Sequence, residues 1–210
     1  LFFLALGAAI ATFIENDFGT ARARDYVYDA LWYEALLVLS ALNIILVVQK
    51  TKMFLHVSRF TFHIAFVFIL IGSGLTRYLG VDGVMKVREN SSSNTIFSTE
   101  KNQEITLPFA LHLKAFELTR YYGSRAPSEY ASEVHIVDGD KQLDTIISMN
   151  NTLTYKGYKF FQTFYDPDEK GTILSVTKDP GMEVTYIGYA LLFLGLLTNF
   201  FDKKSRFRKL

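Results

Sequence analysis

The chain has 210 residues, of which 50% are hydrophobic and 15% aromatic, and its formal net charge is +1. The apolar residues are clustered in long runs, which predicts membrane-spanning segments rather than a single soluble domain. Cysteine is absent, which excludes disulfides, a thiol redox pair, thiolate metal ligands and a Cys-x-x-Cys-His haem-attachment motif. The chain is therefore not itself a c-type cytochrome.

The hydrophobic runs predict four transmembrane helices. A helix that crosses the bilayer core needs about 20 mostly apolar residues. Three windows meet that length, at about 31–48, 60–79 and 184–201, and a shorter one at 1–14 precedes them. We interpret 1–14 as a truncated first helix because the sequence does not open with Met. A signal peptide is the alternative, but its basic leading region is not visible.

Charge divides the loops between the two sides of the membrane. Lys50, Lys52 and Arg59 lie between the second and third spans without an acidic residue. The segment after the fourth span contains five more basic residues: Lys203, Lys204, Arg206, Arg208 and Lys209. Both segments are cytoplasmic by the positive-inside rule. The first loop and the segment 82–183, which carries 11 basic and 15 acidic side chains, are then external.

These boundaries give three parts. Residues 1–81 form three transmembrane helices with short loops, 82–183 an extracytoplasmic β-rich domain, and 184–210 the fourth helix and a basic cytoplasmic tail. Residues 89–99 are rich in Ser and Asn without an apolar period, so we expect a loop there. Asp179-Pro180-Gly181 predicts a turn directly before the fourth helix, which holds the domain close to the membrane surface.

The external segment has the apolar period of strands. Alternate apolar residues at 107–113 and 134–136 predict half-buried strands, and the Asp138-Gly139 pair predicts a hairpin turn. Segments 158–165 and 172–177, separated by a Pro- and Gly-containing breaker, predict a second hairpin. We expect a mostly antiparallel sheet or sandwich.

Four histidines are present, and their positions differ. His112 and His135 fall on the polar faces of predicted strands, where a solvated surface histidine is the default. His56, in the basic inner loop, is interpreted as an interfacial side chain. His63 instead lies in the inner half of the third span, and residues 64–75 after it contain no ionisable group.

An ionisable group inside a span usually has a partner or a function. For His63 three interpretations remain open: a neutral imidazole hydrogen-bonded to a neighbouring helix, for example through Asn43; a proton relay; or a haem ligand. Low-spin haem usually has two axial ligands, whereas the spans contain one histidine. A haem site here would be shared with another polypeptide or with a part of the protein outside this sequence.

Other residues of the spans are interpreted as packing or anchoring residues. Four glycines allow close approach of helices: Gly72, Gly74, Gly188 and Gly195. Arg77 at the outer end of the third span is an interfacial anchor or pairs with Glu15 or Asp17. We find no candidate catalytic residue.

The sequence resembles the ResB/CcsB family, the B component of system II cytochrome c biogenesis, along its whole length. The segments that carry the resemblance are ATFIENDFGT at 11–20, VYDALWYE at 27–34, Phe62-His63-Ile64 with Gly72, Thr76 and Arg77, GYKFFQ at 157–162, and Asp179-Pro180-Gly181. The sequence is similar in its pattern to the B half of a fused CcsBA cytochrome c synthase.

The resemblance implies a haem-handling component that helps to move haem from the cytoplasmic side through a transmembrane site to the outer face, for covalent attachment to apocytochrome c. It implies that His63 is an axial ligand of haem b, shared with a CcsA-type A component that is fused or separate. The haem lyase site itself belongs to the A component in that family, and Trp32 is the only tryptophan here.

The implied location is the bacterial inner membrane, with the large domain on the periplasmic side. The expected partners are the A component, apocytochrome c, haem and the membrane, but not nucleic acid. Two other functions are retained. One is a structural assembly factor without haem, and the other is a subunit of a b-haem electron-transfer complex.

Overall fold

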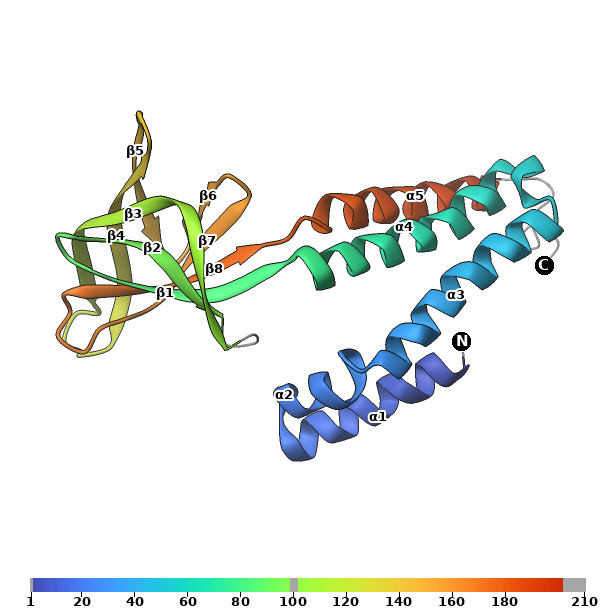
Figure 1. The fold of residues 1–210 in the computed structure, drawn as a ribbon, viewed down its shortest axis with the longest axis horizontal. Coiled ribbons are helices and arrows are strands. Elements are labelled where there is room, and N and C mark those ends of the chain that lie inside the picture. The colour runs from blue at the N-terminus through green and yellow to red at the C-terminus, as the bar shows by residue number, and fades with distance from the viewer. Residues whose placement is uncertain (1, 99–101, 202–210) are drawn as a thin grey trace. The chain divides into compact units, whose positions relative to one another are not determined.

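The computed structural model describes residues 2–98 and 102–201. The predicted basic cytoplasmic tail after the fourth span therefore lies outside the described residues. The chain divides into two compact units. One contains the helices, from Leu1–Arg77 and Gly181–Leu210, and the other, Tyr78–Pro180, contains the strands. Figure 1 shows the elements of both units in chain order.

The helical unit contains four long helices: α1 (Phe2–Phe18), α3 (Leu31–Lys50), α4 (Val57–Leu79) and α5 (Met182–Phe201). Three short elements connect the first three of them: α2 (Thr20–Ala23), η1 (Arg24–Tyr28) and η2 (Met53–Leu55). Helices α3, α4 and α5 are long and apolar enough to cross a membrane, with mean hydropathies of 2.1, 1.6 and 1.6. Helix α1 has 17 residues, a length of about 25 Å at 1.5 Å per residue. A fourth span therefore stays a prediction.

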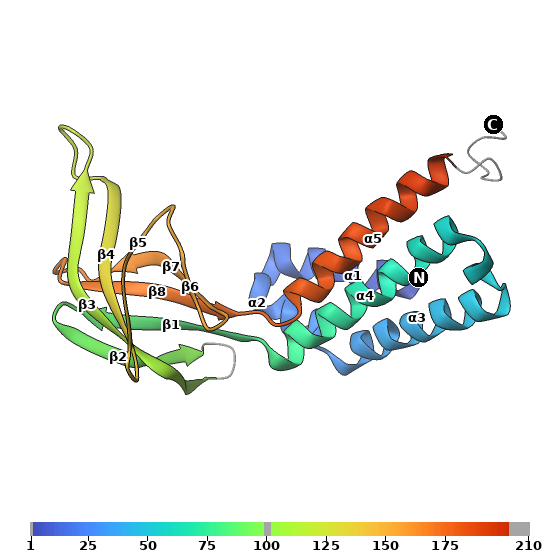
Figure 2. The ribbon, with the colours of Figure 1, turned by 90° about the horizontal axis from the view of Figure 1, so that it is seen from above.

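Helices α4 and α5 lie side by side and antiparallel in both views (Figures 1 and 2). Three of the four predicted packing glycines lie in this contact. A Cβ atom on Gly188 would be 2.7 Å from Ile69 Cγ1, one on Gly195 would be 2.7 Å from the Phe62 nitrogen, and one on Gly72 would overlap Thr185. Small residues thus allow the two backbones to approach closely.

The prediction for Gly74 was wrong for the described part of the chain, because a Cβ atom there would have no neighbour within 4 Å among residues 2–98 and 102–201. Gly72 and Gly74 are two positions apart, and residues at that spacing point to different faces of a helix. The sequence shows both glycines but not which face of α4 contacts α5.

Arg77 joins the end of α4 to the start of α3. Its guanidinium donates to the backbone carbonyls of Tyr28 and Asp29, both at 2.7 Å, and lies 3.4 Å from a Glu34 carboxylate oxygen. The Asp29 carboxylate is 3.3 Å away. The predicted alternative of pairing with Glu15 or Asp17 was wrong, because the turn before α3 presents carbonyls as well as carboxylates. Arg77 has donors for several acceptors at once.

The other unit is one eight-stranded antiparallel sheet with the order β5-β4-β3-β2-β1-β8-β7-β6. Its strands are β1 (Val81–Arg88), β2 (Ser91–Ser98), β3 (Gln103–Arg120), β4 (Pro127–Asp138), β5 (Lys141–Ser148), β6 (Leu153–Tyr155), β7 (Tyr158–Tyr165) and β8 (Gly171–Lys178). The sheet curls until β5 contacts β7, although these strands are not neighbours in that order. The curl encloses one hydrophobic core, to which all eight strands contribute.

The predicted strands and hairpins are confirmed. Along β3 the residues Leu107, Phe109, Leu111 and Leu113 are buried while the residues between them are not. Asp138-Gly139 lies in the β4–β5 turn, where Gly139 has a φ of +59°. That left-handed conformation costs a glycine little.

The loop predicted at 89–99 was wrong over most of its length, since Ser91–Ser98 is strand β2. Ser and Asn are poor strand formers, but β2 pairs with β1 on one side and β3 on the other. Its register shifts between Ser93 and Thr95, and Ile96 enters the core. Pairing on both edges outweighs the weak local propensity, and the register shift hides the apolar period.

Candidate functional site

His63 lies in the second turn of α4, on the helix that also packs against α5. Its Nδ1 atom is 2.8 Å from the backbone carbonyl oxygen of Arg59, one turn earlier. A carbonyl oxygen can only accept, so Nδ1 carries the proton and Nε2 has a free lone pair in the neutral ring. In residues 2–98 and 102–201, no hydrogen bond reaches this Nε2 atom, and none joins the ring to Asn43.

The same arrangement is typical of histidines that bind metals through Nε2. A hydrogen bond from the opposite nitrogen fixes the tautomer and the ring orientation. The neighbouring Phe62 ring contacts the imidazole edge-on, with centroids 5.5 Å apart, and its backbone faces Gly195 of α5. The geometry therefore gives His63 one oriented, available lone pair.

A pocket of about 300 Å³ lies between α1 and α3, away from His63. Its lining is apolar: Phe3, Leu6, Gly7, Ile10, Trp32 and Leu36. Since none of these side chains is ionisable, the pocket offers no ligand for a metal.

The other three histidines lie outside the helix core, and two of them are less solvated than predicted. His56 is exposed, at the end of η2. His112 and His135 are half-buried on the polar face of the sheet. The structure adds that these two residues are direct partners in the β3–β4 register, with Ser92 and Asp144 as the next partners outward. Sequence spacing alone did not indicate this pairing, because it depends on the strand register.

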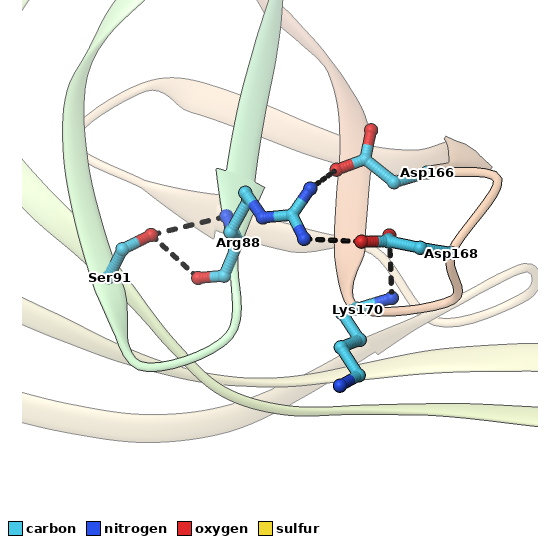
Figure 3. Close-up of polar contacts among 5 residues, drawn as sticks. All are labelled: Arg88, Ser91, Asp166, Asp168 and Lys170. Carbon is cyan, nitrogen blue, oxygen red and sulfur yellow. Dashed lines mark hydrogen bonds and ion pairs between the residues drawn. The ribbon is translucent and has the colours of Figure 1, made fainter.

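The acidic turn between β7 and β8 is held by arginines. Arg88 contacts both Asp166 and Asp168, and the Ser91 hydroxyl bridges the Arg88 backbone in the adjacent turn (Figure 3). The hydrogen bond and charge of Arg88 lower the pKa of Asp168, and the hydrogen bond and charge of Asp168 raise the pKa of Arg88. Arg120 pairs with Glu169 of the same turn. These carboxylates are thus committed to ion pairs, and the described residues contain no group of three or more metal-ligand side chains.

Comparison with known proteins places the chain in a family. A model described as the ResB-like family matches residues 50–173, more than half of the chain. Protein NrfI of Wolinella succinogenes is 44% identical over 99% of this chain, which spans about a third of that relative, 34%. Among solved structures, the cytochrome c haem lyase CcmF aligns with 93% of this chain, and the aligned part covers 33% of the CcmF chain. The sequence identity is 12% and the TM-score is 0.43. The chain belongs to the ResB-like family.

Proposed function

We propose that this chain is the haem-handling B component of a cytochrome c synthase and that His63 supplies one axial ligand to haem in transit. Membership of the ResB-like family supports a role in cytochrome c biogenesis. The observation that carries the residue assignment is the His63 ring, whose Nδ1 is fixed by the Arg59 carbonyl and whose Nε2 has no protein partner in the described ranges.

The residues present fit half of a haem site. A neutral imidazole Nε2 is a common axial ligand of haem iron, and low-spin haem takes two such ligands. The other histidine of the helical unit, His56, is exposed in the connection between α3 and α4. The second ligand would therefore come from an A component, either fused to this chain or separate from it. Haem is the cargo in this proposal, and the covalent attachment belongs to the partner.

The proposed topology has four spans in the bacterial inner membrane, with α1 as the first. The basic residues Lys50, Lys52 and Arg59 support a cytoplasmic position for the α3–α4 connection. His63 lies in the second turn of α4, so in this topology it is in the inner leaflet, where haem made in the cytoplasm arrives. The sheet unit, inserted between α4 and α5, is then periplasmic, on the side where apocytochrome c is matured.

The test is the haem content of the complex purified with its A component. His63→Gly removes the ligand and is expected to lower bound haem several-fold, and added imidazole is expected to restore the low-spin spectrum. His56→Gly, in the adjacent exposed connection, is the matched control and should retain haem. Unchanged haem in His63→Gly would contradict the ligand assignment and favour an assembly factor without haem.

A second assay separates the remaining alternative. The complex is co-expressed with a Cys-x-x-Cys-His apocytochrome, and covalent haem attachment is followed by haem staining. The proposal expects holocytochrome from the wild type and less from His63→Gly. A complex that oxidises quinol but never forms holocytochrome would instead be a b-haem electron-transfer complex.

A further inference from the structure

His112 and His135 form a cross-strand pair on the outer face of the sheet. They are direct partners in the β3–β4 register. Their chain neighbours on the opposite face, including Leu111, Leu113 and Val134, are buried in the core. Both imidazoles therefore project from the same outer face, where directly opposite Cβ atoms are about 4.5–5.5 Å apart.

The Nδ1 atom of each ring has a hydrogen-bond partner in the next residue of the same cross-strand row. Ser92 pairs with His112 and Asp144 pairs with His135 in the strand register. The His135 Nδ1 atom lies 2.8 Å from Asp144 Oδ1, and the His112 Nδ1 atom lies 3.1 Å from Ser92 Oγ. A carboxylate accepts, so His135 Nδ1 donates, and the Ser92 hydroxyl can accept from His112. Across the described strands, no hydrogen bond reaches either Nε2 atom.

We propose that His112 and His135 bind one divalent transition-metal ion through their Nε2 atoms, with Asp144 and Ser92 as positioning residues. Imidazole suits Cu²⁺, Zn²⁺ and Ni²⁺, and a carboxylate on the opposite nitrogen raises the basicity of the ligand. At metal–nitrogen distances of about 2.0–2.1 Å, tetrahedral geometry needs the two Nε2 atoms roughly 3.3 Å apart. Two imidazoles on directly opposite residues of neighbouring strands, whose Cβ atoms are about 4.5–5.5 Å apart, can reach that spacing.

The surroundings are compatible with a cation. Lys114 lies 2.6 Å from Asp144 and 3.8 Å from Glu133, so two carboxylates accompany one ammonium beside the pair. Asp144 serves the Nδ1 atom and is not a third ligand, consistent with the lack of a three-residue metal cluster in the described residues. Water completes the coordination, which predicts a site weaker than a three- or four-ligand zinc centre.

The site is tested on the full chain purified in detergent with an affinity tag that contains no histidine. CuCl₂ and ZnCl₂ are titrated by equilibrium dialysis, and the copper complex is examined by electron paramagnetic resonance. We expect one ion per chain, tighter binding of Cu²⁺ than of Zn²⁺, and nitrogen hyperfine structure from two imidazoles. Absence of saturable binding to folded wild-type protein would overturn the proposal.

Variants separate this pair from the other histidines. The double substitution His112→Asn with His135→Asn should abolish binding of this ion, and Asp144→Asn should weaken it about 10–100-fold. His56→Asn is the control and should bind as the wild type does. All of the altered side chains lie outside the core, and circular dichroism confirms folding. Undiminished binding in the folded double variant would refute the assignment.

Discussion

The close contact between α4 and α5 predicts opposite effects for two glycine-to-alanine substitutions. A Cβ atom on Gly188 would be 2.7 Å from Ile69 Cγ1, 3.0 Å from the Ile69 nitrogen and 3.1 Å from the Ala65 oxygen. Non-bonded carbon atoms are most stable at about 3.5–4.0 Å. The helices would have to separate locally by roughly 1 Å, and overpacking of this kind costs about 1–3 kcal/mol.

Gly74→Ala is the matched control, because a Cβ atom there would meet none of the described residues within 4 Å. In a helix interior, alanine is more favourable than glycine by about 0.5–1 kcal/mol. Since this preference applies to both sites, the two variants should differ by the overpacking cost, about 1–3 kcal/mol, with Gly188→Ala less stable and Gly74→Ala equal to or more stable than wild type. Thermal unfolding in detergent, followed by intrinsic fluorescence, measures the order. Equal melting temperatures for the two variants would refute the described contact.

Three further predictions concern polar contacts. Arg88→Gln should bring the pKa of Asp168 closer to its ordinary value, while the hydrogen bond from the Lys170 backbone remains. Because Arg88 lowers that pKa in the folded state, its stabilisation is present above the unfolded pKa of about 3.9 and is lost as the pH falls through the lowered folded pKa. Acid denaturation curves should therefore show the wild type losing more stability than the variant as the pH falls below about 4. Ser132→Ala removes a buried donor 2.7 Å from Gln162, and a chemical denaturation midpoint should report a loss of about 1–3 kcal/mol; an unchanged midpoint would contradict the network. Arg77→Gln should destabilise the protein by about 2 kcal/mol, measured as a lower melting temperature in detergent, and Arg77→Lys should have an intermediate effect. If neither variant changed the melting temperature, Arg77 would not anchor α4 to the start of α3.

Much of the sheet unit follows from local sequence. The apolar alternation at 107–113 and the turn at Asp138-Gly139 correspond to parts of β3 and to the β4–β5 turn. Strand β2 does not, since its Ser and Asn residues become a strand only because β1 and β3 pair with both of its edges. Pairing of that kind is a tertiary effect, and a local pattern does not contain it.

The candidate site residues can likewise be predicted from the sequence only in part. His63 is visible in the sequence because an ionisable residue is rare in an apolar span. Its available nitrogen is not visible, since that depends on the rotamer that brings Nδ1 to the Arg59 carbonyl. The partner relation of His112 and His135 requires the β3–β4 register, which a slip of one residue would destroy by turning one side chain to the core face.

The two proposed histidine sites share one hydrogen-bonding arrangement, but their geometries suit different ligands. In each, Nδ1 has a hydrogen-bond partner, and no hydrogen bond to Nε2 is found among the described residues. Axial ligands of a haem approach the iron from opposite faces of the macrocycle, whereas His112 and His135 project from one face of one sheet. That pair can bind a small ion but cannot supply both axial ligands of a haem. The asparagine double variant should therefore lose the metal ion and retain the haem of the assembled complex, and His63→Gly should do the reverse. If both sites responded to either change, the sites would not be independent and this division of roles would be wrong.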